Sequence, residues 1–238
     1  MGSVVKGNIH KFWNNHEQAL YFHKSEGVTI DPYHYEEVPD FLTPDECDYI
    51  CHIILRDEEE IKSIPNPTTK PYEGLTVQHE VYNWLNNPDL QDLRIGERLL
   101  NLPTFQPFKM STLQCWANVL RQNQGLATHH HHYYPENTLL ACNIFLGGRE
   151  DTGTHYHYND IGYTRNAVGK LTIVGQRLPH EVKTNIHQTP RISMALDVSL
   201  NPCIIGQKRS FTERFCVYYR NDGESNTHEC MLPLSSIR

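Results

Sequence analysis

The pattern that most constrains the fold begins at Met110, where short apolar runs separated by turn residues replace a more polar sequence. The runs are rich in β-branched and aromatic residues and read "STLQCWANVL", "TLLACNIFL", "KLTIV", "RISMALDVSL", "CIIG" and "RFCVYY". Turn signals such as "QNQG", "YPEN", "GGREDTG" and "NDG" lie between them. Many short strands at this spacing indicate a β-sandwich or a β-barrel.

The sequence before Met110 carries the signals of helices. Residues 38–42 read as a short strand, after which Thr43 suits an N-cap, Pro44 the first helical position and Glu46 the capping-box position. Apolar residues then recur with the helical period, at Cys47, Ile50, Cys51, Ile53 and Ile54. A second helix is predicted over residues 89–100. Helices followed by many strands make the chain α+β.

Length and composition favour one soluble domain. The chain has 238 residues, of which 38% are hydrophobic, enough for one ordinary core. No apolar run reaches the ~18 residues needed to cross a bilayer, and the start of the chain has no signal-peptide core. We therefore expect a cytoplasmic protein that does not bind membranes.

Charge and cysteine usage narrow the function classes further. The net charge of −7, with no basic stripe, does not favour nucleic-acid binding. The seven cysteines are widely spread and form no CxxC pair, which argues against a disulfide scaffold or a zinc ribbon. A reduced compartment, with the thiols packed as small apolar groups, fits this usage.

Four adjacent histidines, His129 to His132 in "THHHHYYP", lie between two predicted strands. Alternate residues of an extended chain share a face, so either His129 and His131 or His130 and His132 form a pair. A His-x-His pair on one face brings two imidazoles close enough to chelate one metal ion. Two ligands are too few for a useful site, so a third must come from elsewhere in the chain.

The segment "LPHEVKTNIHQTPRISMALDV" supplies the missing groups. His180 follows a predicted strand and can be the third ligand. Arg191 lies eleven residues later, and Ser193 shares its face if "RISMALDV" is a strand. Arginine binds a carboxylate through two hydrogen bonds, and a neighbouring hydroxyl adds another. A buried arginine that faces a metal site indicates an acidic cosubstrate.

With these residues in view, the sequence resembles the Fe(II)- and 2-oxoglutarate-dependent oxygenases, in particular the prolyl-4-hydroxylase-like group and its bacterial and phage relatives. The resemblance runs from Val38 to about Val198 and rests on "VPDFLTPDECDYI", "LRQNQGLATHHH" and "LPHEV" followed by "PRIS". It implies Fe(II) at His129, His131 and His180, and it implies that Arg191 and Ser193 hold the distal carboxylate of 2-oxoglutarate. The catalytic residues would then be the three histidines and Arg191.

The same resemblance implies the fold and the reaction. The fold is a double-stranded β-helix, or jelly roll, with N-terminal helices packed on it. The expected layout is one domain, with helical support over 1–109, the core over 110–220 and an extension over 221–238. The expected activity is a dioxygenase that uses 2-oxoglutarate and dioxygen, releases succinate and hydroxylates an unidentified primary substrate.

One feature departs from the family's usual pattern. The commonest motif is His-x-Asp followed by a distal histidine, with one carboxylate among the ligands. Here His131 stands where the aspartate is expected. Three histidines can bind the ion, or Glu136 or Asp160 can supply a carboxylate from a neighbouring loop.

Two other functions fit parts of the sequence. A cupin-type metalloprotein without 2-oxoglutarate would use His130, His132, Glu136 and His180. A non-catalytic binding domain would keep the β-helix without the chemistry.

Several other polar or aromatic residues have two interpretations. His155 and His157 in "THYHYND" can line the substrate pocket or lie on an outer strand face. Asn118 and Asn143 lie inside apolar strands and can bind the near carboxylate of a cosubstrate or be satisfied core amides. Trp116 is expected in the core.

Overall fold

Two antiparallel sheets face each other in the computed structural model, which describes residues 31–63, 84–106, 110–131, 140–199, 216–221 and 224–229. The large sheet has the strand order β1-β7-β4-β9-β2-β10-β11. Its strands are β1 (Tyr35–Val38), β2 (Met110–Leu120), β4 (Leu140–Gly147), β7 (Leu171–Gly175), β9 (Arg191–Ser199), β10 (Cys216–Asn221) and β11 (Glu224–Glu229). The small sheet has the order β3-β8-β5-β6, with β3 (Leu126–His129), β5 (Thr154–Tyr156), β6 (Gly162–Thr164) and β8 (His180–Val182). The α+β jelly-roll prediction is confirmed.

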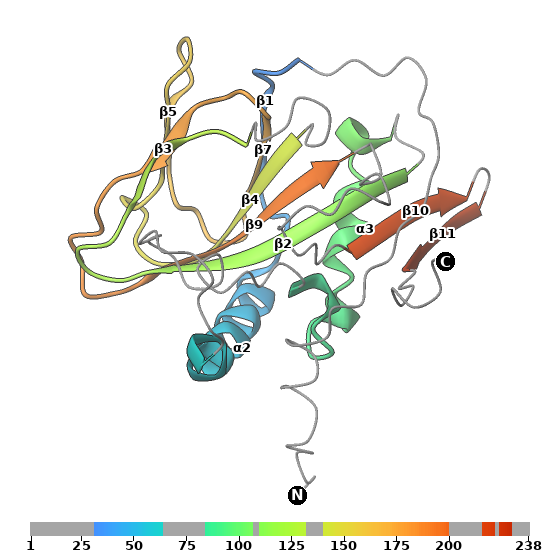
Figure 1. The fold of residues 1–238 in the computed structure, drawn as a ribbon, viewed down its shortest axis with the longest axis horizontal. Helices are drawn as coiled ribbons and strands as arrows, with labels where there is room; N and C mark the ends of the chain where they lie inside the picture. The colour runs from blue at the N-terminus through green and yellow to red at the C-terminus, as the bar shows by residue number, and fades with distance from the viewer. Residues whose placement is uncertain are drawn as a thin grey trace, which may run out of the picture.

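Strand alternation gives the large sheet two different faces. On β9, Arg191, Ser193, Ala195 and Asp197 point toward the small sheet, and the residues between them point the other way. Figure 1 shows helix α2 (Pro44–Ser63) on that other side, across the large sheet from β3 and β5. The main hydrophobic core fills the space between the large sheet and the helices.

The capping signals before α2 are confirmed. The backbone N–H of Thr43 donates to the Glu46 carboxylate at 2.8 Å, and the N–H of Glu46 donates to the Thr43 hydroxyl at 3.2 Å. This reciprocal pair is a capping box. The apolar stripe of α2, with Ile50 and Ile54 fully buried, packs against β4. The helix therefore supports the outer face of the large sheet, away from the cavity between the sheets.

The strand predicted over residues 38–42 lies earlier in the chain than expected. β1 covers Tyr35–Val38 and pairs with β7, and the chain then turns at Asp40, where φ is +52°. The Leu42 N–H donates to the carbonyl of Gly169 instead of continuing a ladder along β1. The apolar residues Phe41 and Leu42 are buried by this turn, so burial rather than strand pairing explains the apolar pattern.

The second predicted helix, residues 89–100, is broken. A 3₁₀ turn over Gln91–Leu93 ends at Arg94, whose left-handed backbone (φ +49°, ψ +39°) cannot continue a helix. A short helix, α3 (Ile95–Leu100), then begins. Apolar periodicity alone does not reveal this break, because both pieces bury their apolar side chains in the same core.

The two sheets meet through a smaller cluster of side chains. Ala141 of β4 and Val174 of β7 pack with Tyr156 of β5 and with Leu178. The first two residues belong to the large sheet and Tyr156 to the small one, so this cluster marks the space between the sheets. The side chains that line this space are the candidates for chemistry.

The domain layout stays a prediction. β1 comes from the segment expected to be helical support, and β11 extends the large sheet beyond residue 220. The expected "CIIG" strand lies outside the described residues. Within the described ranges, no helix has both the length and the apolar character needed to cross a membrane.

Candidate functional site

Three histidines converge between the sheets. His129 ends β3 and lies opposite His180, the first residue of β8. His131 follows two residues later, and its backbone N–H donates to the carbonyl of Gln176 at 3.1 Å. One nitrogen of each ring lies within 4.8 Å of one nitrogen of each other ring. This is the spacing of a metal site, and within the described ranges it is the one group of this kind.

The neighbours of Nδ1 in the three rings indicate which nitrogen faces the centre of the group. Nδ1 of His129 lies 2.8 Å from the carbonyl of Ala127, and Nδ1 of His180 lies 2.9 Å from the carbonyl of Leu178. Nδ1 of His131 lies 2.6 Å from Oδ1 of Asp197. A carbonyl oxygen accepts a proton, so His129 and His180 carry the proton at Nδ1 and present a lone pair at Nε2. The contact between His131 and Asp197 is an ion pair without hydrogen-bond geometry, and the negative charge of the carboxylate favours the proton at Nδ1 of His131 as well.

The free lone pairs make the arrangement suited to a cation. Nε2 of His131 and Nε2 of His180 lie 3.3 Å apart, with their rings nearly parallel at 8°. Two lone pairs facing each other repel unless a positive charge lies between or beside them. The donor set therefore fits a divalent transition metal, for which neutral imidazole is a good ligand.

Burial keeps two of the rings, those of His129 and His180, neutral at neutral pH. Burial, with the neighbouring His131 and His129 adding to it, lowers the pKa of His180 well below its usual value. Burial and the adjacent His131 lower the pKa of His129 as well. Neutral imidazoles keep Nε2 available as a ligand at neutral pH.

The structure brings one pair of the histidine run to His180. His129 and His131 join His180, whereas His130 is exposed and is not part of the group. Asp160 is exposed and is not part of the group either. His132 and Glu136, which the cupin interpretation needs, lie outside the described residues.

Arg191, on the inner face of β9, is the most completely buried charged side chain among the described residues, with 1% of its surface exposed. Its Nε donates to the carbonyl of Thr152 at 2.8 Å, Nη1 to the hydroxyl of Ser193 at 3.0 Å and Nη2 to the hydroxyl of Thr154 at 3.3 Å. The guanidinium also lies over the ring of Phe145, 5.4 Å from its centroid.

These partners of Arg191 are all neutral. Among the described residues no carboxylate forms an ion pair with it, and burial lowers its pKa to about 10. It is therefore still charged at neutral pH. A buried charge without a counter-ion is costly, so the position is suited to an anionic ligand.

Strand β5 connects the arginine with the histidines. Thr154, at its start, accepts the hydrogen bond from Arg191, and the ring of Tyr156 lies 5.7 Å from the ring of His180. Thr154 and Tyr156 are two residues apart on one face, a separation of roughly 6.5 Å along a strand. The buried guanidinium and the three imidazoles therefore lie along one face of β5, next to positions that are two residues apart.

Sequence reasoning missed both of these β5 residues. The His-x-His pattern drew attention to His155 and His157, but alternation along β5 points Tyr156 inward and His155 outward. The ring of His155 lies 4.8 Å from Tyr163, and His157 is exposed and lies 3.3 Å from Glu181. The two histidines are thus on the outer face, one of the two positions considered.

Three further side chains belong to the face of the large sheet that carries Arg191 and Ser193. Asn118 is buried on β2 opposite Ser193. Asn143 lies on β4, and within the described residues its buried Nδ2 has no hydrogen-bond partner. Trp116, expected in the core, is half-buried, and its ring lies 6.0 Å from that of His131. The wall near the histidines is thus partly polar.

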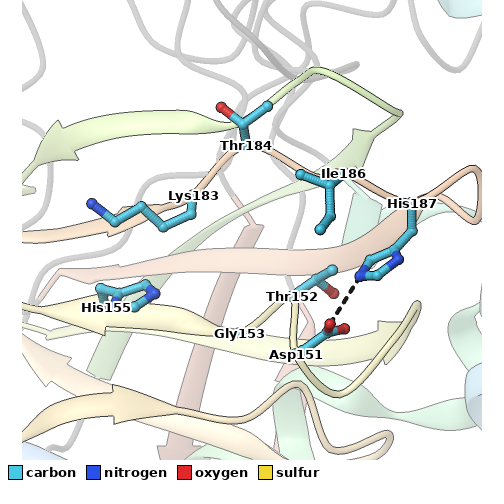
Figure 2. Close-up of a pocket in the computed structure, with 8 residues that line it drawn as sticks. All are labelled: Asp151, Thr152, Gly153, His155, Lys183, Thr184, Ile186 and His187. Atoms are coloured by element: carbon cyan, nitrogen blue, oxygen red, sulfur yellow. Dashed lines mark hydrogen bonds and ion pairs between the residues drawn. The ribbon is translucent and has the colours of Figure 1, made fainter.

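A separate small cavity of about 110 Å³ lies on the outer side of the small sheet. Figure 2 shows Asp151 and His187 joined by an ion pair at one end, with His155 and Lys183 at the other. Thr152 lines this cavity and also accepts the hydrogen bond from Arg191, so its backbone separates the outer cavity from the buried guanidinium.

Solved structures share this architecture, although no protein-family model and no curated protein matches the sequence. A prolyl-4-hydroxylase from Pseudomonas putida matches with a TM-score of 0.55 and 11% identity, over 71% of this chain and 94% of that one. The non-heme α-ketoglutarate-dependent epimerase SnoN from nogalamycin biosynthesis matches with a TM-score of 0.53 and 14% identity, over 81% of each chain. EvdO2 from Micromonospora carbonacea var. aurantiaca matches with a TM-score of 0.53 and 14% identity, over 77% of this chain and 96% of that one. At these identities the likeness shows the fold, which is that of the 2-oxoglutarate-dependent oxygenases.

Proposed function

We propose that the protein is an Fe(II)- and 2-oxoglutarate-dependent dioxygenase. His129, His131 and His180 would hold Fe(II), and Arg191 with Ser193 would hold the distal carboxylate of 2-oxoglutarate. The observation that carries the proposal is the inner face of β5, where Thr154 contacts the arginine and Tyr156 contacts His180. A dicarboxylate that reached both positions would have one end at the metal.

Each residue then has a defined task. Arg191 binds the distal carboxylate with charge-assisted hydrogen bonds, and the Ser193 hydroxyl, 3.0 Å from Nη1, fixes the guanidinium in place. Phe145 and Tyr156 are buried and exclude water from the cosubstrate. The unpartnered Nδ2 of Asn143 is placed to donate to a ligand in the cavity.

The iron, when bound, supplies the redox chemistry that couples dioxygen to loss of carbon dioxide from 2-oxoglutarate, leaving succinate. The protein's contribution is to fix three imidazole lone pairs through acceptors at each Nδ1 and to keep the site buried. Three imidazoles would hold the ion and would leave it positions for the cosubstrate and dioxygen.

Hydroxylation of an unidentified primary substrate is the outcome that we propose. Proteins with this fold also catalyse reactions other than hydroxylation, because one structural neighbour is a prolyl-4-hydroxylase and another is an epimerase. The primary substrate is therefore best sought after the cosubstrate has been established.

The first test is cosubstrate binding without oxygen. Protein reconstituted with Fe(II) under anaerobic conditions is titrated with 2-oxoglutarate, and both the visible charge-transfer absorption and the heat of binding are recorded. We expect a weak visible band that saturates with one equivalent of 2-oxoglutarate and is not produced by succinate. No band together with no heat of binding would refute the proposal.

The second test admits oxygen. Slow substrate-independent turnover should convert 2-oxoglutarate to succinate in wild-type protein and not in an Arg191→Met variant. Metal content that stays far below one ion per chain would instead favour a non-catalytic binding domain.

A further inference from the structure

The ligand group contains no carboxylate, yet a carboxylate lies directly behind it. Asp197 Oδ1 is 2.6 Å from His131 Nδ1, on the side of the ring opposite to the metal-facing Nε2. Asp197 itself is not one of the residues whose ligand atoms come together within 4.8 Å. It therefore touches a proposed ligand without belonging to the set.

The carboxylate of Asp197 needs a partner such as His131 because of where it lies in the large sheet. It lies on β9, six residues after Arg191 on the same inner face, with Ala141 of β4 and Gln114 of β2 as its strand neighbours. Its side chain is only 14% exposed. A buried carboxylate in the middle of a sheet is costly unless it is paired, and here His131 of the opposite sheet is its partner.

We propose that Asp197 positions His131 and supplies, from outside the ligand set, the negative charge that a ligand aspartate supplies in the His-x-Asp pattern. The carboxylate lies 2.6 Å from Nδ1 of His131 as an ion-pair contact, and its charge favours the proton at that nitrogen. Nε2 is thereby left as the metal ligand and becomes a stronger donor. This inference rests on the metal site of the proposed function and assigns Asp197 the role of a positioning residue.

The sequence supports this exchange of roles. Position 131, where the resemblance places an aspartate, carries histidine. The carboxylate is instead that of Asp197, which contacts this histidine from outside the group of three imidazoles. The other two imidazoles use backbone carbonyls at Nδ1, so His131 is the one with a charged partner. Among the three imidazoles, His131 alone therefore has a negatively charged group beside its Nδ1.

The test is metal affinity measured without 2-oxoglutarate. Metal-free protein is titrated with Co(II), and the visible ligand-field absorption reports both affinity and coordination. Asp197→Asn keeps the shape and an acceptor oxygen but removes the charge. We expect Co(II) affinity to fall by roughly 10- to 100-fold, with a shifted absorption spectrum. Asp197→Glu should recover part of the affinity.

A matched control removes an equal charge nearby. Glu181 follows His180 in the chain, but it points to the outer face, where it contacts Lys183 and accepts from Thr128. Glu181→Gln should leave the Co(II) spectrum unchanged and the affinity within about twofold. A loss equal to that of Asp197→Asn would show a general charge effect and overturn the proposal.

A second variant separates positioning from folding. His131→Asp places a carboxylate at the ligand position itself, so removal of Asp197 in that background should no longer weaken Co(II) binding. An equal loss of Co(II) affinity in both backgrounds would mean that Asp197 only stabilises the fold. Lower thermal stability of the metal-free protein with no spectral change would mean the same.

The outcomes also distinguish the two proposals. Wild-type protein that binds neither Co(II) nor Fe(II) contradicts the proposed function. Wild-type protein that binds metal no more tightly than Asp197→Asn contradicts this inference alone.

Discussion

The two sheets that enclose the cavity hold their functional groups by different means. Arg191 and Ser193 lie on β9, a nine-residue strand paired on both sides. His129 and His180 lie on β3 and β8, of four and three residues, and His131 follows β3. The β3 register is irregular between Leu126 and His129. The anion position thus depends on the regular register of β9 with β2, although the register of β9 with β4 shifts beside Ile192 and Ser193. The metal position depends on a short strand whose pairing with β8 is irregular.

That difference explains why the two halves of the site differ in predictability. Alternation along one strand is enough to put Arg191 and Ser193 on one face. The histidine register depends instead on where a short strand begins and shifts, which the sequence does not encode as a simple period. Variants in each sheet should therefore affect metal and cosubstrate binding separately.

The largest effect is expected at the small sheet. His180→Ala removes a ligand, so Fe(II) or Co(II) affinity should fall by more than about 100-fold, beyond the loss typical of an outer partner. Calorimetric titration of the metal-free protein measures it. His130→Ala is the matched control, because His130 is exposed and outside the group. Equal losses in the two variants would contradict the assigned register.

The next effect belongs to the large sheet. Arg191→Met should lower 2-oxoglutarate affinity by about 100-fold or more, since hydrogen bonds to a charged group contribute about 1.5–3 kcal/mol each. Metal affinity should stay close to that of the wild type. Arg191→Lys should recover only part of the loss, because an ammonium lacks the planar fork. Metal binding that fell together with 2-oxoglutarate binding would show that the two positions are not separable.

A backbone variant tests the irregular strand itself. A Cβ at Gly125 would lie 2.7 Å from the carbonyl oxygen of Val182 and 3.0 Å from the amide nitrogen of Thr184. Gly125→Ala should therefore push β3 away from β8, lower the free energy of unfolding by about 1–3 kcal/mol and weaken metal binding. Thermal unfolding and a Co(II) titration below the melting temperature measure the two effects.

A glycine of the large sheet provides the control for that variant. A Cβ at Gly147 would lie 3.3 Å from the sulfur of Cys51, on the helix side of the sheet. Gly147→Ala should lower the melting temperature while leaving metal affinity unchanged. Weakened metal binding in this variant would show that the site responds to stability in general.

The smallest effect is expected at Ser193. Ser193→Ala removes one hydrogen bond from the charged guanidinium of Arg191 to a neutral hydroxyl, worth about 1.5 kcal/mol, so 2-oxoglutarate affinity should fall by about tenfold. The charge-transfer titration under anaerobic conditions measures it. An effect as large as that of Arg191→Met would mean that the hydroxyl, rather than the guanidinium, is the main anchor.

Sequence reasoning recovered the features that local rules determine. The Thr43–Glu46 capping box and the inward pair Arg191 and Ser193 follow from spacing alone. It missed the left-handed turns at Asp40 and Arg94, because tertiary contacts support a backbone that these residue types rarely adopt.

The other omissions concern partners from distant strands. Thr154, Tyr156 and Asp197 each gain their importance from a residue on another strand, 24 to 66 positions away. A single sequence does not reveal such pairs. The histidine run itself left two registers open, and only the pairing of β3 with β8 selects between them.

The four adjacent histidines also bear on how the site tolerates change. A one-residue slip of a strand moves its side chains to the opposite face, which would ordinarily destroy a two-ligand motif. In this chain such a slip would bring His130 and His132 inward in place of His129 and His131. An insertion or deletion of one residue in the turn before β3 would therefore still bring two imidazoles to the metal position. The length of that turn could change during evolution without loss of the two ligands.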